Sequence, residues 1–134
     1  MIYWNIVDFK RFYFFENLQS VVIGNDVKTV GGYAFGDCSA LKRVKLGDSV
    51  ETIGEYAFIN CSNLTTVRIN NSASIYDYAF LNCTALTTIT IPEQNTFIGD
   101  YAFSGCYNLE EVQFQGTTTA VSSGEISSIG SFAF

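Results

Sequence analysis

The residues with the clearest chemical potential are four evenly spaced cysteines. Cys38, Cys61, Cys83 and Cys106 are separated by 23, 22 and 23 residues. One cysteine per period at the same phase predicts a column in which the Cβ vectors run parallel, which favours buried free thiols over disulfides. Zinc is disfavoured because the chain has no histidine and no close C-x-x-C spacing. We expect neither a metal nor another cofactor.

Carboxylates are the second group that could do chemistry. Glu55, Asp77 and Asp100 recur at one phase, so they should line up along one edge. Such a row could bind Ca²⁺, but the ligands are sparse and a compact Asp-x-Asp loop is missing, which favours a solvated acidic edge. Without histidine, Ser-His-Asp and Cys-His arrangements are impossible. The sequence predicts no catalytic residues and a non-enzymatic protein.

These residues belong to a pattern that covers most of the chain. A Leu follows each cysteine by three residues, a Val or Ile comes three later, and an apolar residue closes the set two residues further on. A fixed period of this length is typical of a solenoid, in which each repeat buries its apolar face against its neighbours. We therefore expect one domain over 1–134, with 1–17 as a degenerate N-terminal cap, repeats of 22–23 residues over 18–134, an insertion at 115–124, and truncation within the last repeat.

The pattern also predicts the elements that position these residues. Apolar and polar residues alternate in Leu-x-x-Val-x-Leu, which predicts parallel strands at Leu41–Leu46, Leu64–Ile69, Leu86–Ile91 and Leu109–Phe114. Shorter extended segments should line the opposite wall at Val27–Val30, Val50–Ile53 and Ile126–Ile129. We expect a glycine to lead from each short segment into a tight turn, and the Ala-Phe-x-x-Cys run to form one helical or 3₁₀ turn. The result is a β-rich α/β repeat solenoid.

Two aromatic columns follow from the same period. The phenylalanines at 35, 58, 80 and 103 should form a buried spine. The tyrosines at 33, 56, 78 and 101, continued by Phe132, form either a structural ladder or an amphipathic strip for a protein or sugar partner.

The outward positions of the main sheet give the most specific functional signal. Read along the stack, they change from basic through threonine to acidic. Charge order of this kind sets the orientation and association rate of a partner, although threonine is also simply compatible with a pleated surface. The candidate partner-binding residues are Lys42, Arg43, Lys45, Thr66, Arg68, Thr88, Thr90, Glu110, Glu111 and Gln113.

Composition and length exclude several classes of partner. The net charge of −6 argues against nucleic acid, whose binding requires clustered Lys and Arg. No stretch approaches the length of a membrane-spanning helix, so we expect no membrane insertion. The first residues contain no visible signal peptide, because the basic front is missing and Asp8, Lys10 and Arg11 interrupt the apolar run.

The repeated motif I-G-x-Y-A-F-x-x-C-x-x-L-x-x-V-x-L resembles the leucine-rich repeats of the BspA-like subclass, found in bacterial and protist cell-surface proteins. The motif recurs around Cys38, Cys61 and Cys106, and around Cys83 with Tyr76 in place of Gly. The resemblance implies a leucine-rich-repeat array with one parallel sheet face, a cell-surface or secreted location, and an adhesive or protein-interaction role with a protein or glycan partner. The alternative is a structural spacer or self-associating fragment of a larger surface protein, with end-to-end contacts through Val112, Phe114 and Phe134.

Overall fold

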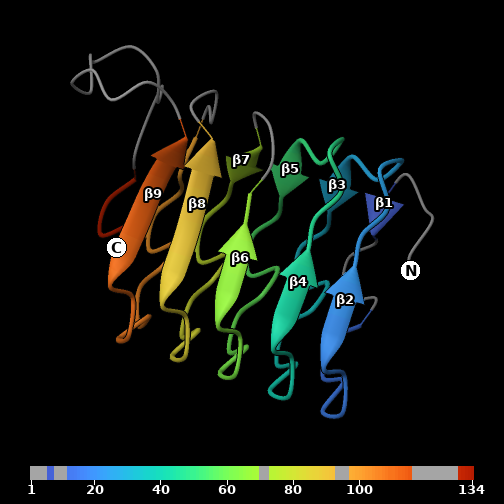
Figure 1. The fold of residues 1–134 in the computed structure, drawn as a ribbon, viewed down its shortest axis with the longest axis horizontal. Helices are drawn as coiled ribbons and strands as arrows, with labels where there is room; N and C mark the ends of the chain where they lie inside the picture. Colours follow the sequence, from blue (N-terminus) through green and yellow to red (C-terminus); the bar gives the residue numbers. More distant parts are fainter. Residues whose placement is uncertain (1–5, 8–11, 70–72, 93–96, 116–129) are drawn as a thin grey trace.

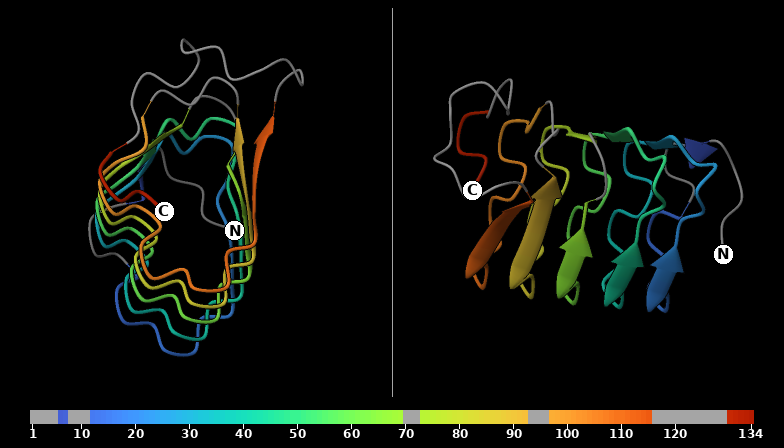
Figure 2. Two further views of the ribbon diagram at one scale, coloured as in Figure 1. Left: turned by 90° about the vertical axis from the view of Figure 1, so that its left-hand side faces the viewer. Right: turned by 45° about the horizontal axis from the view of Figure 1, so that its top comes forward.

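The protein is a stack of similar coils with a parallel sheet on each of two walls (Figure 1). The computed structural model describes residues 6–7, 12–69, 73–92, 97–115 and 130–134. The larger sheet has the order β2-β4-β6-β8-β9 and the smaller one β1-β3-β5-β7. Viewed along the stacking axis, successive coils nearly superimpose (Figure 2, left). The predicted repeat solenoid is confirmed.

Each coil contributes one strand to the larger sheet, and all its pairings are parallel. The five strands are β2 (Ser20–Val22), β4 (Arg43–Lys45), β6 (Thr66–Arg68), β8 (Thr88–Pro92) and β9 (Glu111–Gln115). Four of them lie within or just beyond the predicted segments, but they begin two residues later than expected. The leucine that opens each predicted segment instead closes a turn with the cysteine three residues before it, as in the bond from Leu64 N to Cys61 O at 3.0 Å.

The smaller sheet is built from two-residue strands. These are β1 (Ile6–Val7), β3 (Thr29–Val30), β5 (Thr52–Ile53) and β7 (Ser74–Ile75). Two of the predicted short segments contain β3 and β5, whereas β7 was not predicted, and the third segment, 126–129, lies outside the described residues. No helix that could cross a membrane is present in the part of the chain that the structure describes.

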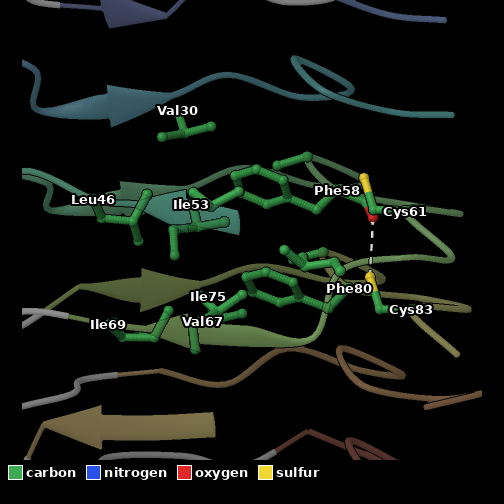
Figure 3. Close-up of a cluster of buried hydrophobic side chains, with 14 of the residues drawn as sticks. Val30, Leu46, Ile53, Phe58, Cys61, Val67, Ile69, Ile75, Phe80 and Cys83 are labelled. Atoms are coloured by element: carbon green, nitrogen blue, oxygen red, sulfur yellow. Dashed lines mark hydrogen bonds between the residues drawn. The ribbon is translucent and has the colours of Figure 1, made fainter. Parts of the chain in front are cut away.

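The core lies between the two walls, and Figure 3 shows part of it, where Phe80 and Cys83 repeat the positions of Phe58 and Cys61 one coil later. In β4 and β6 the middle residue is buried and its two neighbours are exposed, which is the alternation that a strand with one covered face requires. The predicted phenylalanine spine is confirmed: Phe35, Phe58, Phe80 and Phe103 are fully or almost fully buried. Neighbouring rings are nearly parallel, with centroids 5.2 or 5.3 Å apart. Phe12 extends the same stack onto Phe35 at 5.2 Å.

The run from glycine to cysteine forms a ladder of single turns, and the expected helical or 3₁₀ turn is not confirmed. In one coil, alternate backbone N–H groups donate either to the next coil or three residues back. Those of Tyr56, Phe58 and Asn60 donate to Asp77, Ala79 and Leu81, whereas those of Ala57, Ile59 and Cys61 donate to Gly54, Tyr56 and Phe58. Consecutive 3₁₀ bonds cannot form because every second donor belongs to the stack.

Left-handed residues make this alternation possible. Tyr56 and Asn60 have φ values of 58° and 57°, and each is the third residue of a turn, where a type II turn requires positive φ. Gly54 opens the first of these turns, as expected, and it does so without positive φ. A Cβ atom on Gly54 would lie 2.8 Å from the backbone nitrogen of Gly32, so this glycine permits close approach between coils. Tyr76 stands at the same position one coil later, so the close approach is not needed in every coil.

Candidate partner-binding face

The outer face of the larger sheet is the candidate functional site. Because β4 and β6 alternate between buried and exposed residues, the side chains at their first and third positions point away from the core. The face extends over β2, β4, β6, β8 and β9, which lie side by side in Figure 1. We call the outward residues of these five strands the sheet face.

The strand register brings the predicted residues together in two columns, as the sequence indicates. The first column runs through Ser20, Arg43, Thr66, Thr88 and Glu111, and the second through Val22, Lys45, Arg68, Thr90 and Gln113. Ser20 and Val22 were not among the predicted site residues, although the match of Val21 to the repeat pattern is the signal that places them. No aromatic residue occurs in either column.

The basic end of the sheet face is a cluster of like charges. Lys45 and Arg68 are direct cross-strand neighbours, and Arg43 shares the exposed side of β4 with Lys45. Like charges at opposed positions destabilise a sheet. Arg43, Lys45 and Arg68 form no salt bridge with another described residue. The salt bridge that does occur within the described ranges joins Lys28 and Glu51 at 3.2 Å, at the smaller sheet.

A hollow of about 280 Å³ adjoins this cluster. It is lined by Val44, Lys45, Leu46, Asp48 and Arg68. Two cationic side chains and one carboxylate therefore surround it, so its charge balance favours an anionic group.

The middle and the far end of the sheet face are neutral and then acidic. Thr90 bonds to the side-chain oxygen of Gln113 across the strands at 3.4 Å. Glu110 and Glu111 are exposed at the far end, and Lys42, at the basic end, is exposed just before β4. The structure thus gives the face the predicted order of charge from β4 to β9.

The cysteines form a buried column, as predicted, and each thiol has a partner that the sequence did not indicate. Every Sγ donates to the carbonyl oxygen of the phenylalanine in the preceding coil, over 3.0 to 3.3 Å. The bond from Cys83 to Phe58 is drawn in Figure 3. Burial raises the pKa of the Cys61 and Cys83 thiols well above their usual range. These two thiols are therefore protonated and inaccessible, so they are not nucleophiles.

Two members of the predicted acidic edge have a structural role. Asp77 Oδ1 accepts the backbone N–H of Asp100 at 2.9 Å, and Asp100 Oδ1 accepts that of Ser131 at 2.6 Å. Each carboxylate thus caps the turn of the following coil. In the described part of the chain, acidic and cysteine side chains form no group of three or more that could hold a metal ion.

The tyrosine column is a stacked ladder. Neighbouring rings have centroids 4.6 to 5.2 Å apart, and Phe132 continues the stack at 5.4 Å from Tyr101. Each tyrosine ring inside the column has both faces covered by its neighbours, so these rings present edges and hydroxyl groups outward. This geometry agrees with the structural interpretation of the column.

Sequence reasoning missed an amide ladder beside the tyrosines. Asn60 Nδ2 donates to Asp37 Oδ1 at 2.7 Å, and Asn82 Nδ2 donates to Asn60 Oδ1 at 3.0 Å. All three residues have positive φ, as does Gly105 at the same position one coil later. The signal was the recurrence of Asp, Asn and Gly, the types that tolerate this conformation, at one phase.

The three residues predicted to mediate self-association differ in their surroundings. The Phe134 side chain is 52% exposed, and one face of its ring stacks on Phe103 at 5.2 Å. Val112 is half-buried against the core. The Phe114 side chain lies outside the described residues.

Comparisons with known proteins agree with this architecture. The family model described as "BspA type Leucine rich repeat region" matches residues 5–134 in six copies. No match was found among curated proteins. The chain is similar to a leucine-rich cell surface protein from Faecalibacterium prausnitzii (25% identity, TM-score 0.82, 92% of this chain and 33% of that one) and to a leucine-rich repeat protein from Eubacterium ventriosum (29%, 0.77, 95% and 32%). The Treponema pallidum leucine-rich repeat protein shares the fold (23% identity, TM-score 0.61, 82% and 64%).

The matches differ in how much of each protein they cover. The chain spans about a third of the length of the first two similar structures. The family model, in contrast, covers almost all of the chain. The chain belongs to the BspA-type leucine-rich repeat family.

Proposed function

We propose that this chain is a non-enzymatic interaction module that binds a partner through the sheet face, as part of a cell-surface protein. The similar Faecalibacterium structure is named a cell-surface protein, which supports the proposed location. The observation that carries the binding proposal is the group of cations formed by Arg43, Lys45 and Arg68. It lacks salt bridges within the described residues, and β4 and β6 hold its members side by side.

Stability alone does not account for this cluster. Cross-strand like charges cost free energy, and the protein, with a net charge of −6, has acidic residues in excess. Four of its seven lysines and arginines nevertheless lie at this end of the sheet face, at 42, 43, 45 and 68. A partner with complementary charge would offset the repulsion and would orient itself on the surface.

A peptide library displayed on phage tests the proposal without knowledge of the natural partner. The library is selected on the wild-type protein, and each selected clone is then tested on Lys45→Glu/Arg68→Glu. Lys28→Glu serves as the control, since Lys28 lies at the smaller sheet and is 64% exposed. The proposal predicts that most clones lose binding to the double variant and keep binding to the control. Clones that bind all three proteins equally would contradict it.

A second candidate function is a spacer whose ends associate. It is favoured by the exposed outer face of Phe134, because its other face continues the phenylalanine stack. The exposed face of the Phe134 ring would offer a contact to a second chain, together with Val112 and Phe114. Light scattering coupled to size exclusion should then show a molar mass that rises with concentration, and Phe134→Ala should reduce the rise. A constant monomer mass would refute this candidate.

A further inference from the structure

We propose that the sheet face recognises an extended protein segment with acidic residues at one end and a basic residue at the other, in either direction along the segment. About four positions separate the outermost acidic residue from the basic residue. The acidic residues lie over Arg43, Lys45 and Arg68, and the basic residue lies over Glu110 and Glu111. This inference rests on the proposed function and adds the class of the partner to it.

The spacing follows from the strand order. The step from β4 through β6 and β8 to β9 crosses three strand spacings, each of about 4.8 Å, which gives about 14 Å. An extended chain rises about 3.3 Å per residue, so roughly four residues cover that distance. A segment that crosses the strands can therefore place an acidic side chain over β4 and a basic one over β9. A second acidic residue, two positions after the first, lies near β6.

The order of charge favours a peptide over an anionic glycan. Glu110 and Glu111 would repel a chain of sulfates, whereas a peptide can carry both signs of charge. Sugars commonly pack their apolar faces on aromatic rings, but neither column of the sheet face contains an aromatic residue. In the tyrosine ladder the inner rings cover one another.

The size of the face favours a narrow segment over a second copy of this chain. The five strands together contain 19 residues, and about 3.3 Å per residue with about 4.8 Å between strands gives an area of roughly 300 Å². A stable dimer buries about 800 Å² on each partner. One extended segment is sufficient to cover the face.

Two peptides of identical composition test the spacing. Both carry fluorescein, are blocked at their ends and are flanked by serines; one has the core Glu-Thr-Glu-Thr-Lys and the other Glu-Thr-Lys-Thr-Glu. Binding is measured by fluorescence anisotropy at low ionic strength, where exposed charges are least screened. The first peptide should bind at least about five-fold more tightly than the second, a ratio typical of one or two exposed ion pairs. Equal affinities, or no binding of either peptide, would overturn the inference.

Protein variants locate the binding. Lys45→Glu/Arg68→Glu should weaken the first peptide at least about ten-fold, because two attractions become repulsions, whereas Lys28→Glu should leave it unchanged. The wild-type protein should also bind the first peptide more tightly than a third one, Glu-Thr-Glu-Thr-Glu. Glu110→Lys/Glu111→Lys should reverse this second preference. No change in preference would remove Glu110 and Glu111 from the site.

Two further results separate this inference from the function on which it rests. Tighter binding of a heparin hexasaccharide than of any peptide would replace the peptide with an anionic glycan and overturn the inference. Phage clones that need Lys45 and Arg68 but lack the acidic-to-basic spacing would overturn the inference and leave the interaction module in place. Failure of both face-dependent selection and peptide binding would reject the two proposals together.

Discussion

Removing one ring from the phenylalanine spine tests the packing of the stack most severely. The Phe58 ring is fully buried and lies between Phe35 and Phe80, with centroid distances of 5.3 and 5.2 Å. Truncation of such a side chain to alanine typically costs about 3 to 5 kcal/mol, since the surroundings relax only in part. Relaxation is restricted here because the neighbouring coils are tied by backbone bonds on both sides of the gap, such as Phe58 N to Ala79 O at 2.8 Å. We therefore expect Phe58→Ala to lose about 4 kcal/mol of the free energy of unfolding.

Urea unfolding followed by circular dichroism measures this loss. Phe58→Leu is the matched variant: it keeps most of the apolar volume but removes both ring contacts, so it should lose about half as much. Phe134→Ala is the control at the end of the stack, where the ring is 52% exposed and has one ring neighbour, Phe103, in the stack. It should cost about 1 kcal/mol. A loss below about 1 kcal/mol for Phe58→Ala would refute the reasoning, because that value is typical of an exposed position.

Three further predictions concern groups that hold the coils together. Because burial raises the pKa of Cys61 and Cys83, unfolding releases their protons above about pH 8.5, and the free energy of unfolding should fall there by about 1.4 kcal/mol per pH unit for each thiol. Cys61→Ala should make the decline shallower by that amount in urea titrations between pH 8 and 10, and an unchanged slope would contradict the assignment. Asn60→Ala should lower the free energy of unfolding by about 2 to 3 kcal/mol, because it loses two amide-ladder bonds and leaves a Cβ at positive φ. Asn60→Gly should lower it by about 1 kcal/mol less. Equal thermal stability of the two variants would argue against backbone strain. Gly54→Ala should lower the melting temperature, because its Cβ would lie 2.8 Å from a backbone nitrogen of the preceding coil; an unchanged melting temperature would show that the coils can separate there.

The outward residues of the sheet face were predictable because an apolar residue recurs at the centre of each strand. Once Val44, Val67, Ile89 and Val112 are aligned, the residues on either side must point outward. The register then follows from the alignment, as the pairs Arg43 with Thr66 and Lys45 with Arg68 confirm. The buried cysteines were predictable for the same reason.

The turns were less predictable because stacking overrides local preference. Tyrosine does not favour positive φ, yet Tyr33, Tyr56, Tyr78 and Tyr101 all adopt it, with values between 54° and 58°. The backbone bonds between coils and the stacked rings fix this conformation, and both arise only when neighbouring coils are present. A local pattern such as Ala-Phe-x-x-Cys therefore resembles a short helical turn when read in a single repeat.

The binding role of the sheet face could not be predicted to the same depth. Arg43, Lys45 and Arg68 specify a sign of charge and a spacing, and many partners satisfy both. The hollow beside Lys45 and Arg68 was also invisible in the sequence, since it depends on Asp48 and on how β4 ends.

The most direct test of the binding surface is an NMR titration of the ¹⁵N-labelled protein with the Glu-Thr-Glu-Thr-Lys peptide. The sheet-face account predicts that the largest amide shifts fall on Arg43–Lys45, Thr66–Arg68 and Glu111. They should disappear in Lys45→Glu/Arg68→Glu while the spectrum remains that of a folded protein. Shifts centred on the tyrosine ladder at Tyr56 and Tyr78, with the sheet face unchanged, would contradict the account and move the binding surface to the turn side of the solenoid.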